Sequence, residues 1–229
     1  PDGWTFSPDP HYPEATLDKA NGLTLLWQVY TKAVPTYTGR VTVPLLWDCE
    51  RDTAVSNESA DIVRMFGQAF DAYAGNACRF FPAEQAEAIE ALSAMISRRV
   101  NAGVYRAGLA TSQDDYDRAL TDLFAALDQL EERLSDGRPY LLGERLLEPD
   151  LLLFPTLARF EAVYFPLFRC NLRRLSDYPG LTAHTRRIYA LPGVAETLPM
   201  DHVKRHYYDD WGEIDPTLVP AGPPLSFEG

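Results

Sequence analysis

The hydrophobic pattern of this chain changes once, near residue 75, and this change constrains the fold more than any other feature. Before it, two β-rich runs at 41–47 and 53–55 lie between segments with helical spacing. After it, every periodic segment repeats its apolar residues at intervals of three and four, and no strand pattern returns. The sequence therefore predicts a small α/β portion at 1–75, an all-α portion at 76–208 and an irregular tail at 209–229.

The spacing of apolar residues predicts the position of each element. We expect helices over 17–33, 62–70, 83–102, 112–134, 150–165 and 181–189. The segment 150–165 is apolar almost all round, which is typical of a buried central helix. The run at 41–47 contains Pro44, which cannot donate to a central strand, so we expect this strand to be entered through Val43 and Pro44.

The charge balance and the cysteine count argue against several classes of function. The chain has 33 acidic and 21 basic residues, and a net charge of −12 repels phosphate backbones and anionic lipid. We therefore expect neither nucleic acid nor a membrane as partner. Because no apolar run approaches the roughly 20 residues that cross a bilayer and no signal peptide is visible, we expect a cytoplasmic protein. The histidines show no zinc spacing, and we expect no metal.

Several motifs are similar to those of one enzyme family. They are GRVTVPLLWD at 39–48, VSNES at 55–59, NAGVYRA at 101–107, RFEAVY at 159–164, LPGVAET at 191–197 and KRHYY at 204–208. In these motifs the chain resembles the glutathionyl-hydroquinone reductases, the Xi class of the omega-like glutathione transferases. The resemblance implies an α/β thioredoxin-like N-terminal domain, truncated here, followed by an all-α glutathione-transferase C-terminal domain. It also implies a homodimer.

The resemblance further implies a reaction. Glutathione would be the co-substrate, and a protein cysteine would take the glutathionyl group from a hydroquinone conjugate as a mixed disulfide. In the family this cysteine belongs to a Cys-Pro motif that precedes the segment matched by Gly3 and Trp4. That motif is not among these 229 residues. We therefore expect the chain to be a fragment, and to be inactive in the reductase reaction.

The residues that would hold glutathione lie in the α/β portion. The resemblance implies glutathione binding by Trp4, Arg40, Val41, Thr42, Val43, Pro44, Glu58 and Ser59. A backbone turned outward by a cis Val43–Pro44 bond would pair with the cysteinyl part of the ligand. The helix start at Glu58 and Ser59 would receive its γ-glutamyl end. Two other interpretations remain open from the residues alone, a trans Val-Pro bond and helix capping by Ser56, Asn57 or Ser59.

Tyrosines of the helical portion match the part of the family site that faces the reacting sulfur and the quinol. These are Tyr105 and Tyr207, with Tyr164 in a supporting role. A phenol can hold a quinol hydroxyl or donate to a developing oxyanion, although buried structural tyrosines are commoner than catalytic ones. Leu167 departs from the family, which commonly has a histidine there, and this puts the substrate range in question.

No cysteine of the chain has the setting of a nucleophile. Cys49 lies between two acidic residues, and Cys78 and Cys170 lack the Cys-Pro context at a helix start. Two functions from other classes therefore stay open beside the reductase. One is a non-catalytic module that binds glutathione or quinones, and the other is a conjugating glutathione transferase that activates glutathione with a serine or tyrosine.

Overall fold

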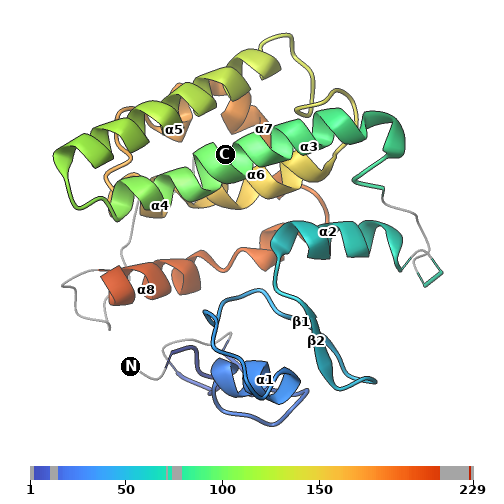
Figure 1. The fold of residues 1–229 in the computed structure, drawn as a ribbon. Coiled ribbons are helices and arrows are strands. Elements are labelled where there is room, and N and C mark those ends of the chain that lie inside the picture. Colours follow the sequence, from blue (N-terminus) through green and yellow to red (C-terminus); the bar gives the residue numbers. More distant parts are fainter. Residues whose placement is uncertain (1–2, 11–14, 71, 74–78, 212–226, 228–229) are drawn as a thin grey trace. The chain divides into compact units, whose positions relative to one another are not determined.

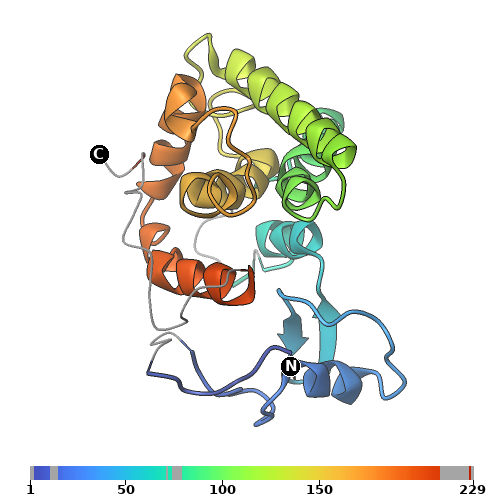
Figure 2. The same cartoon turned by 90° about the vertical axis from the view of Figure 1, so that its left-hand side faces the viewer.

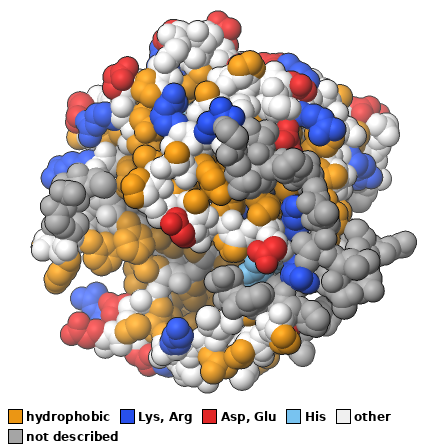
Figure 3. All heavy atoms as spheres, turned by 180° about the vertical axis from the view of Figure 1, so that it is seen from behind, with side chains coloured by type: hydrophobic (Ala, Val, Ile, Leu, Met, Phe, Trp, Pro, Cys, Tyr) orange, Lys and Arg blue, Asp and Glu red, His pale blue; other side chains and the backbone are white. Residues whose placement is uncertain are grey.

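The computed structural model describes residues 3–10, 15–70, 72–73, 79–211 and 227 (Figure 1). The chain divides into two compact units, Pro1–Cys78 and Arg79–Gly229. Each unit has its own apolar core. Figure 3 shows one face of the molecule, on which acidic and basic side chains are interspersed among apolar ones. No helix in the described part of the chain is both long and apolar enough to span a bilayer.

The first unit combines a two-stranded sheet with two short helices. Its elements are α1 (Leu26–Ala33), β1 (Leu46–Asp48), β2 (Thr53–Ser56) and α2 (Ser59–Gln68). The strands are antiparallel, with Trp47 opposite Ala54, and a bulge follows Leu46. Buried Leu26, Val29 and Tyr30 of α1 form the centre of the core. The strand–turn–strand–helix order predicted for this region is confirmed.

Two boundaries in the first unit differ from the prediction. The helix expected over 17–33 begins only at Leu26. Before it, the Asp18 carboxylate accepts the backbone N–H groups of residues 20, 21 and 23, and Gly22 adopts a left-handed φ of 69°. This local turn competes with a helix. The strand expected over 41–47 starts at Leu46, because Pro44 has no N–H to give to a ladder.

The second unit is all helical. It contains a 3-10 turn (Ala83–Gln85), α3 (Ala86–Met95), a π-helical segment (Ile96–Asn101), α4 (Ala102–Gly108), α5 (Gln113–Leu134), α6 (Glu148–Arg159), a π-helical segment (Phe160–Tyr164), α7 (Pro179–Tyr189) and α8 (Met200–Trp211), with short 3-10 turns at Leu175–Asp177 and Ala195–Thr197. Figure 2 shows α6 in the middle of this unit. Its buried residues confirm the predicted central helix.

The clearest sequence pattern matches the structure best. The start of α5 is capped by Ser112, whose hydroxyl accepts the Asp115 N–H at 3.2 Å. Its predicted apolar stripe is buried from Leu120 to Leu134. By contrast, α8 was not predicted, and it continues to Trp211, so the irregular tail cannot begin at 209. Residues 212–226 and 228–229 of the predicted tail lie outside the described part of the chain.

Candidate active site

Three tyrosine hydroxyls meet in the second unit. Tyr105 comes from α4, Tyr164 from the π-helical segment after α6, and Tyr207 from α8. The Tyr207 hydroxyl lies 2.5 Å from that of Tyr105 and 3.0 Å from that of Tyr164, so it joins the other two into one hydrogen-bonded chain. Tyr164 is 3% exposed and Tyr207 9%, whereas Tyr105 is 36% exposed. The structure thus brings together all three predicted tyrosines and leaves Tyr105 at the surface end.

The surroundings raise the pKa of two of these phenols, Tyr105 and Tyr164, and keep them protonated. Burial, together with the hydrogen bond to Tyr207, raises the pKa of Tyr105 to about 12, although the Arg159 charge opposes the shift. Burial and the two neighbouring phenols raise the pKa of Tyr164 far above its ordinary value. A neutral phenol is a hydrogen-bond donor. The cluster can therefore donate to an oxygen of a bound molecule throughout the neutral pH range.

Removing the central hydroxyl tests this coupling. In Tyr207→Phe we expect the Tyr105 pKa to fall from about 12 part of the way towards 10, because the hydrogen bond is lost while the burial remains. The measurement is a titration followed by NMR of tyrosines labelled with ¹³C at Cζ, with circular dichroism to verify folding at each pH. Tyr208→Phe is the control, since the Tyr208 hydroxyl donates instead to the Ala162 carbonyl. An unchanged Tyr105 titration in Tyr207→Phe would contradict the coupling.

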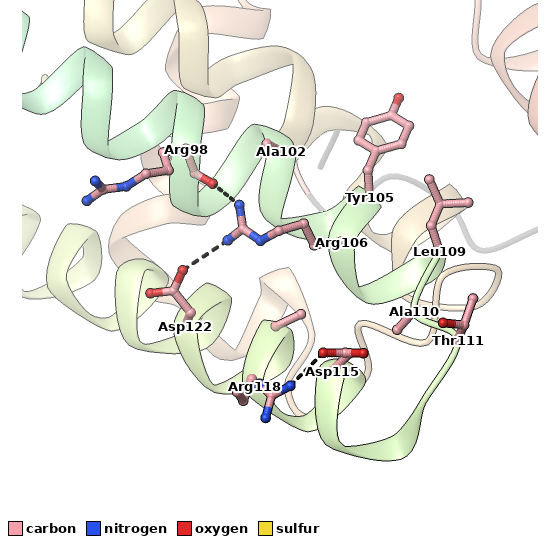
Figure 4. Close-up of a pocket in the computed structure, with 11 residues that line it drawn as sticks. Arg98, Ala102, Tyr105, Arg106, Leu109, Ala110, Thr111, Asp115, Arg118 and Asp122 are labelled. Atoms are coloured by element: carbon pink, nitrogen blue, oxygen red, sulfur yellow. Dashed lines mark hydrogen bonds and ion pairs between the residues drawn. The ribbon is translucent and has the colours of Figure 1, made fainter.

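A hollow of about 1000 Å³ lies between α4 and α5 beside Tyr105 (Figure 4). One ion pair joins the two helices, Arg106 to Asp122 at 3.0 Å, and a second runs along α5, Arg118 to Asp115 at 2.6 Å. These charges neutralise one another, and apart from Arg98 the rest of the lining is mainly apolar and includes the Tyr105 ring. This wall suits a flat aromatic molecule better than an anion. No sequence pattern indicates this hollow, because its lining comes from separate helical segments.

In the first unit, the predicted glutathione loop is held by one buried tyrosine. The Val43–Pro44 peptide bond is cis, as the resemblance implied. The Tyr30 hydroxyl donates to the Thr42 carbonyl at 2.7 Å and accepts from the Asn57 amide at 3.1 Å. These bonds bring the loop at 40–44 next to the start of α2. The sequence predicts Tyr30 only as an apolar helix residue, since helical spacing does not show what its hydroxyl contacts.

The start of α2 leaves a carboxylate and several N–H groups at the surface. Glu58 holds the capping position but makes no capping hydrogen bond with its side chain, and Ser59 is the first helical residue. Both side chains are exposed. Arg40 is exposed and Val41 half-buried on the neighbouring loop. The Trp4 side chain is 44% exposed, and its carbonyl accepts from the first N–H of α1 at 3.0 Å.

Neither described cysteine has the environment of a nucleophile. Burial raises the pKa of Cys170 to about 12, and its sulfur faces backbone carbonyls of Val104 and Phe168. Cys49 is exposed in the turn between the strands. Cys78 lies outside the described residues. Among the residues that the structure describes, no group of three or more His, Cys, Asp or Glu side chains is arranged to hold a metal ion.

Comparisons with known proteins point in one direction. Residues 113–187 match the family model described as "Glutathione S-transferase, C-terminal domain". The chain is 44% identical to glutathionyl-hydroquinone reductase PcpF of Sphingobium chlorophenolicum, over 99% of this chain and 72% of that protein. It is 46% identical to glutathionyl-hydroquinone reductase YqjG of Escherichia coli, over 96% of this chain and 67% of that protein.

Solved structures agree with this result. The glutathione-bound structure of YqjG superposes with a TM-score of 0.91 at 42% identity, covering 99% of this chain and 73% of that chain. The Xi-class glutathione transferase of Natrialba magadii gives 0.92 at 41% identity, covering 100% of this chain and 69% of that one. Sequence identity of this order over nearly the whole chain establishes kinship as well as fold. The chain belongs to the glutathionyl-hydroquinone reductases, the Xi class of the glutathione transferases.

Proposed function

We propose that this chain carries the glutathione-binding loop and the quinol-binding tyrosines of a glutathione-dependent reductase of glutathionyl-hydroquinones. The observation that carries the proposal is the hydrogen-bonded chain of Tyr105, Tyr207 and Tyr164, in which burial raises the pKa of Tyr105 and Tyr164 and keeps both protonated. The names of PcpF and YqjG supply the reaction class. A glutathione-bound relative of 42% identity supports glutathione as the co-substrate.

In the proposed reaction, a cysteine thiolate attacks the sulfur of the glutathionyl-hydroquinone. The bond between this sulfur and the ring carbon breaks, the electron pair goes to the ring, and the ring carbon takes up a proton. The products are the hydroquinone and a protein–glutathione mixed disulfide. A second glutathione thiolate attacks the mixed disulfide, releases glutathione disulfide and restores the protein thiolate. Tyr105 and Tyr207 would hold the quinol oxygens as hydrogen-bond donors.

Glutathione has two carboxylates and one ammonium group. In the first unit we propose partners for its γ-glutamyl carboxylate, its ammonium group and its cysteinyl backbone. The free N–H groups at the start of α2 and the Ser59 hydroxyl would bind the γ-glutamyl carboxylate. The Glu58 carboxylate would accept from its ammonium group. The Val43 backbone would pair with the cysteinyl part, and Trp4 and Arg40 would border the ligand. We also infer, from the family, that the chain forms a homodimer.

Assays of the 229-residue chain test this proposal. We expect calorimetry to detect binding of glutathione and of reduced menadione, and we expect no turnover of glutathionyl-menadiol, because neither Cys49 nor Cys170 is placed as a nucleophile. Turnover at a rate that survives replacement of all three cysteines by serine would contradict the thiol mechanism. Conjugation of glutathione to 1-chloro-2,4-dinitrobenzene would favour the conjugating transferase instead. Absence of binding to either ligand would overturn the proposal.

A further inference from the structure

The three tyrosines share one aromatic neighbour, Phe168, which lies in the turn after the second π-helical segment. Its ring centroid is 5.3 Å from that of Tyr105, 5.5 Å from that of Tyr164 and 6.0 Å from that of Tyr207. The ring is 2% exposed. Because the tyrosines come from separate elements, a ring in contact with all three can set their relative positions.

Phe168 packs directly against α4 because Gly108 has no side chain to keep it away. A Cβ at Gly108 would lie 2.7 Å from Cδ2 and 2.9 Å from Cβ of Phe168, closer than atoms can approach. Gly108 is three residues after Tyr105, so both lie on one face of α4. Gly108 shows no left-handed φ, so here the glycine provides space rather than an unusual backbone conformation.

The residue after Phe168 secures the turn. Arg169 has a left-handed φ of 58°, which is uncommon for a residue other than glycine. Its carbonyl accepts from the Tyr116 hydroxyl at 2.6 Å, and its guanidinium donates to the Gly108 carbonyl at 3.3 Å. The next N–H, that of Cys170, donates to the Tyr164 carbonyl at 3.0 Å. These bonds tie the turn to α4, to α5 and to the backbone of a cluster tyrosine.

We propose that Phe168, seated on Gly108, is the positioning residue that holds Tyr105, Tyr164 and Tyr207 in one hydrogen-bonded chain. The ring excludes water from the phenols and fixes the distance between α4 and α8 at their hydroxyls. The importance of this role for catalysis rests on the proposed function. The positioning itself is a property of the described chain and can be measured without turnover.

The test uses Phe168→Leu, Gly108→Ala and the double variant, with the ¹³C titration of Tyr105 as readout. In Phe168→Leu we expect water to reach the phenols and the Tyr105 pKa to fall by about 1 unit or more from about 12. Gly108→Ala should produce a similar fall, because its Cβ displaces the ring. The double variant should resemble Phe168→Leu alone, since the added Cβ then has no phenyl ring to displace.

Phe124→Leu is the matched control. Phe124 is 3% exposed and packs edge-to-face on Phe160, so its loss should lower stability without moving the Tyr105 titration. If Phe168→Leu leaves the Tyr105 titration unchanged, or if Phe124→Leu moves it equally, the positioning role is overturned. Additive effects in the double variant would overturn the Gly108 contact. Failure of the wild-type chain to bind reduced menadione would instead count against the proposed function, because the titration does not depend on it.

Discussion

Replacing Asp150 by alanine is expected to lower the free energy of unfolding by about 3–5 kcal/mol, the largest loss that we expect from a single side chain here. Asp150 is fully buried at the start of α6. One carboxylate oxygen accepts from the Leu141 N–H at 2.9 Å and lies 2.8 Å from the His184 ring nitrogen. The other accepts from the Leu147 N–H at 2.9 Å. Alanine would leave these buried groups without their partner.

The sequence makes this site more dependent on Asp150 than a typical helix start. The capping position of α6 is Leu147, whose side chain has no oxygen to offer. The Leu147 side chain is wholly buried, so it stabilises the core by apolar packing and makes no capping hydrogen bond. Asp150 therefore provides the side-chain hydrogen bond at this helix start.

Urea unfolding monitored by circular dichroism measures the effect. The control is Asp114→Ala, an exposed acid in the first turn of α5, where we expect a loss below about 1 kcal/mol. A similar small loss in Asp150→Ala would show that the buried network is not what stabilises the second unit. A changed slope of the unfolding free energy against urea would show that the variant exposes a different surface on unfolding or does not unfold in two states.

The second large effect is expected on glutathione binding. Glu58→Ala should weaken glutathione binding roughly 10- to 100-fold, because a hydrogen bond to a charged group contributes about 1.5–3 kcal/mol. Calorimetric titration of the 229-residue chain with glutathione measures the affinity. The side chain makes no capping hydrogen bond in α2, so its loss should hardly change stability.

Glu50→Ala is the control for charge, since Glu50 is an exposed acid in the turn of the same unit. Its hydrogen bond to Asp48 is made by the backbone N–H, which alanine retains. It should leave the affinity unchanged. If Glu58→Ala lowers the unfolding free energy and leaves the affinity as it was, Glu58 is a structural residue and the proposed contact with the ammonium group is wrong. Equal weakening by both variants would point to the net charge of the unit rather than to a contact.

Local patterns predicted most of the helical unit. The helical spacing of the apolar residues at 112–134 is enough to predict α5, because it places these residues on the one face of the helix that is buried in the core. Two predictions failed where the apolar spacing was misleading or weak. The helix at 17–33 lost its first turns to the Asp18 turn, and α8 was missed because its residues 200–208 are largely polar and carry no long apolar stripe.

Motifs and apolar spacing within consecutive residues predicted the family, the order of the elements as far as α7 and the three tyrosines of the cluster. The sequence by itself could not show that Tyr207 joins the hydroxyls of Tyr105 and Tyr164, because these positions are 102 and 43 residues away from it. It could not show why residue 108 is glycine, because the reason is a ring 60 positions further on. Contacts between distant segments depend on how the helices pack against one another, which local sequence patterns do not show.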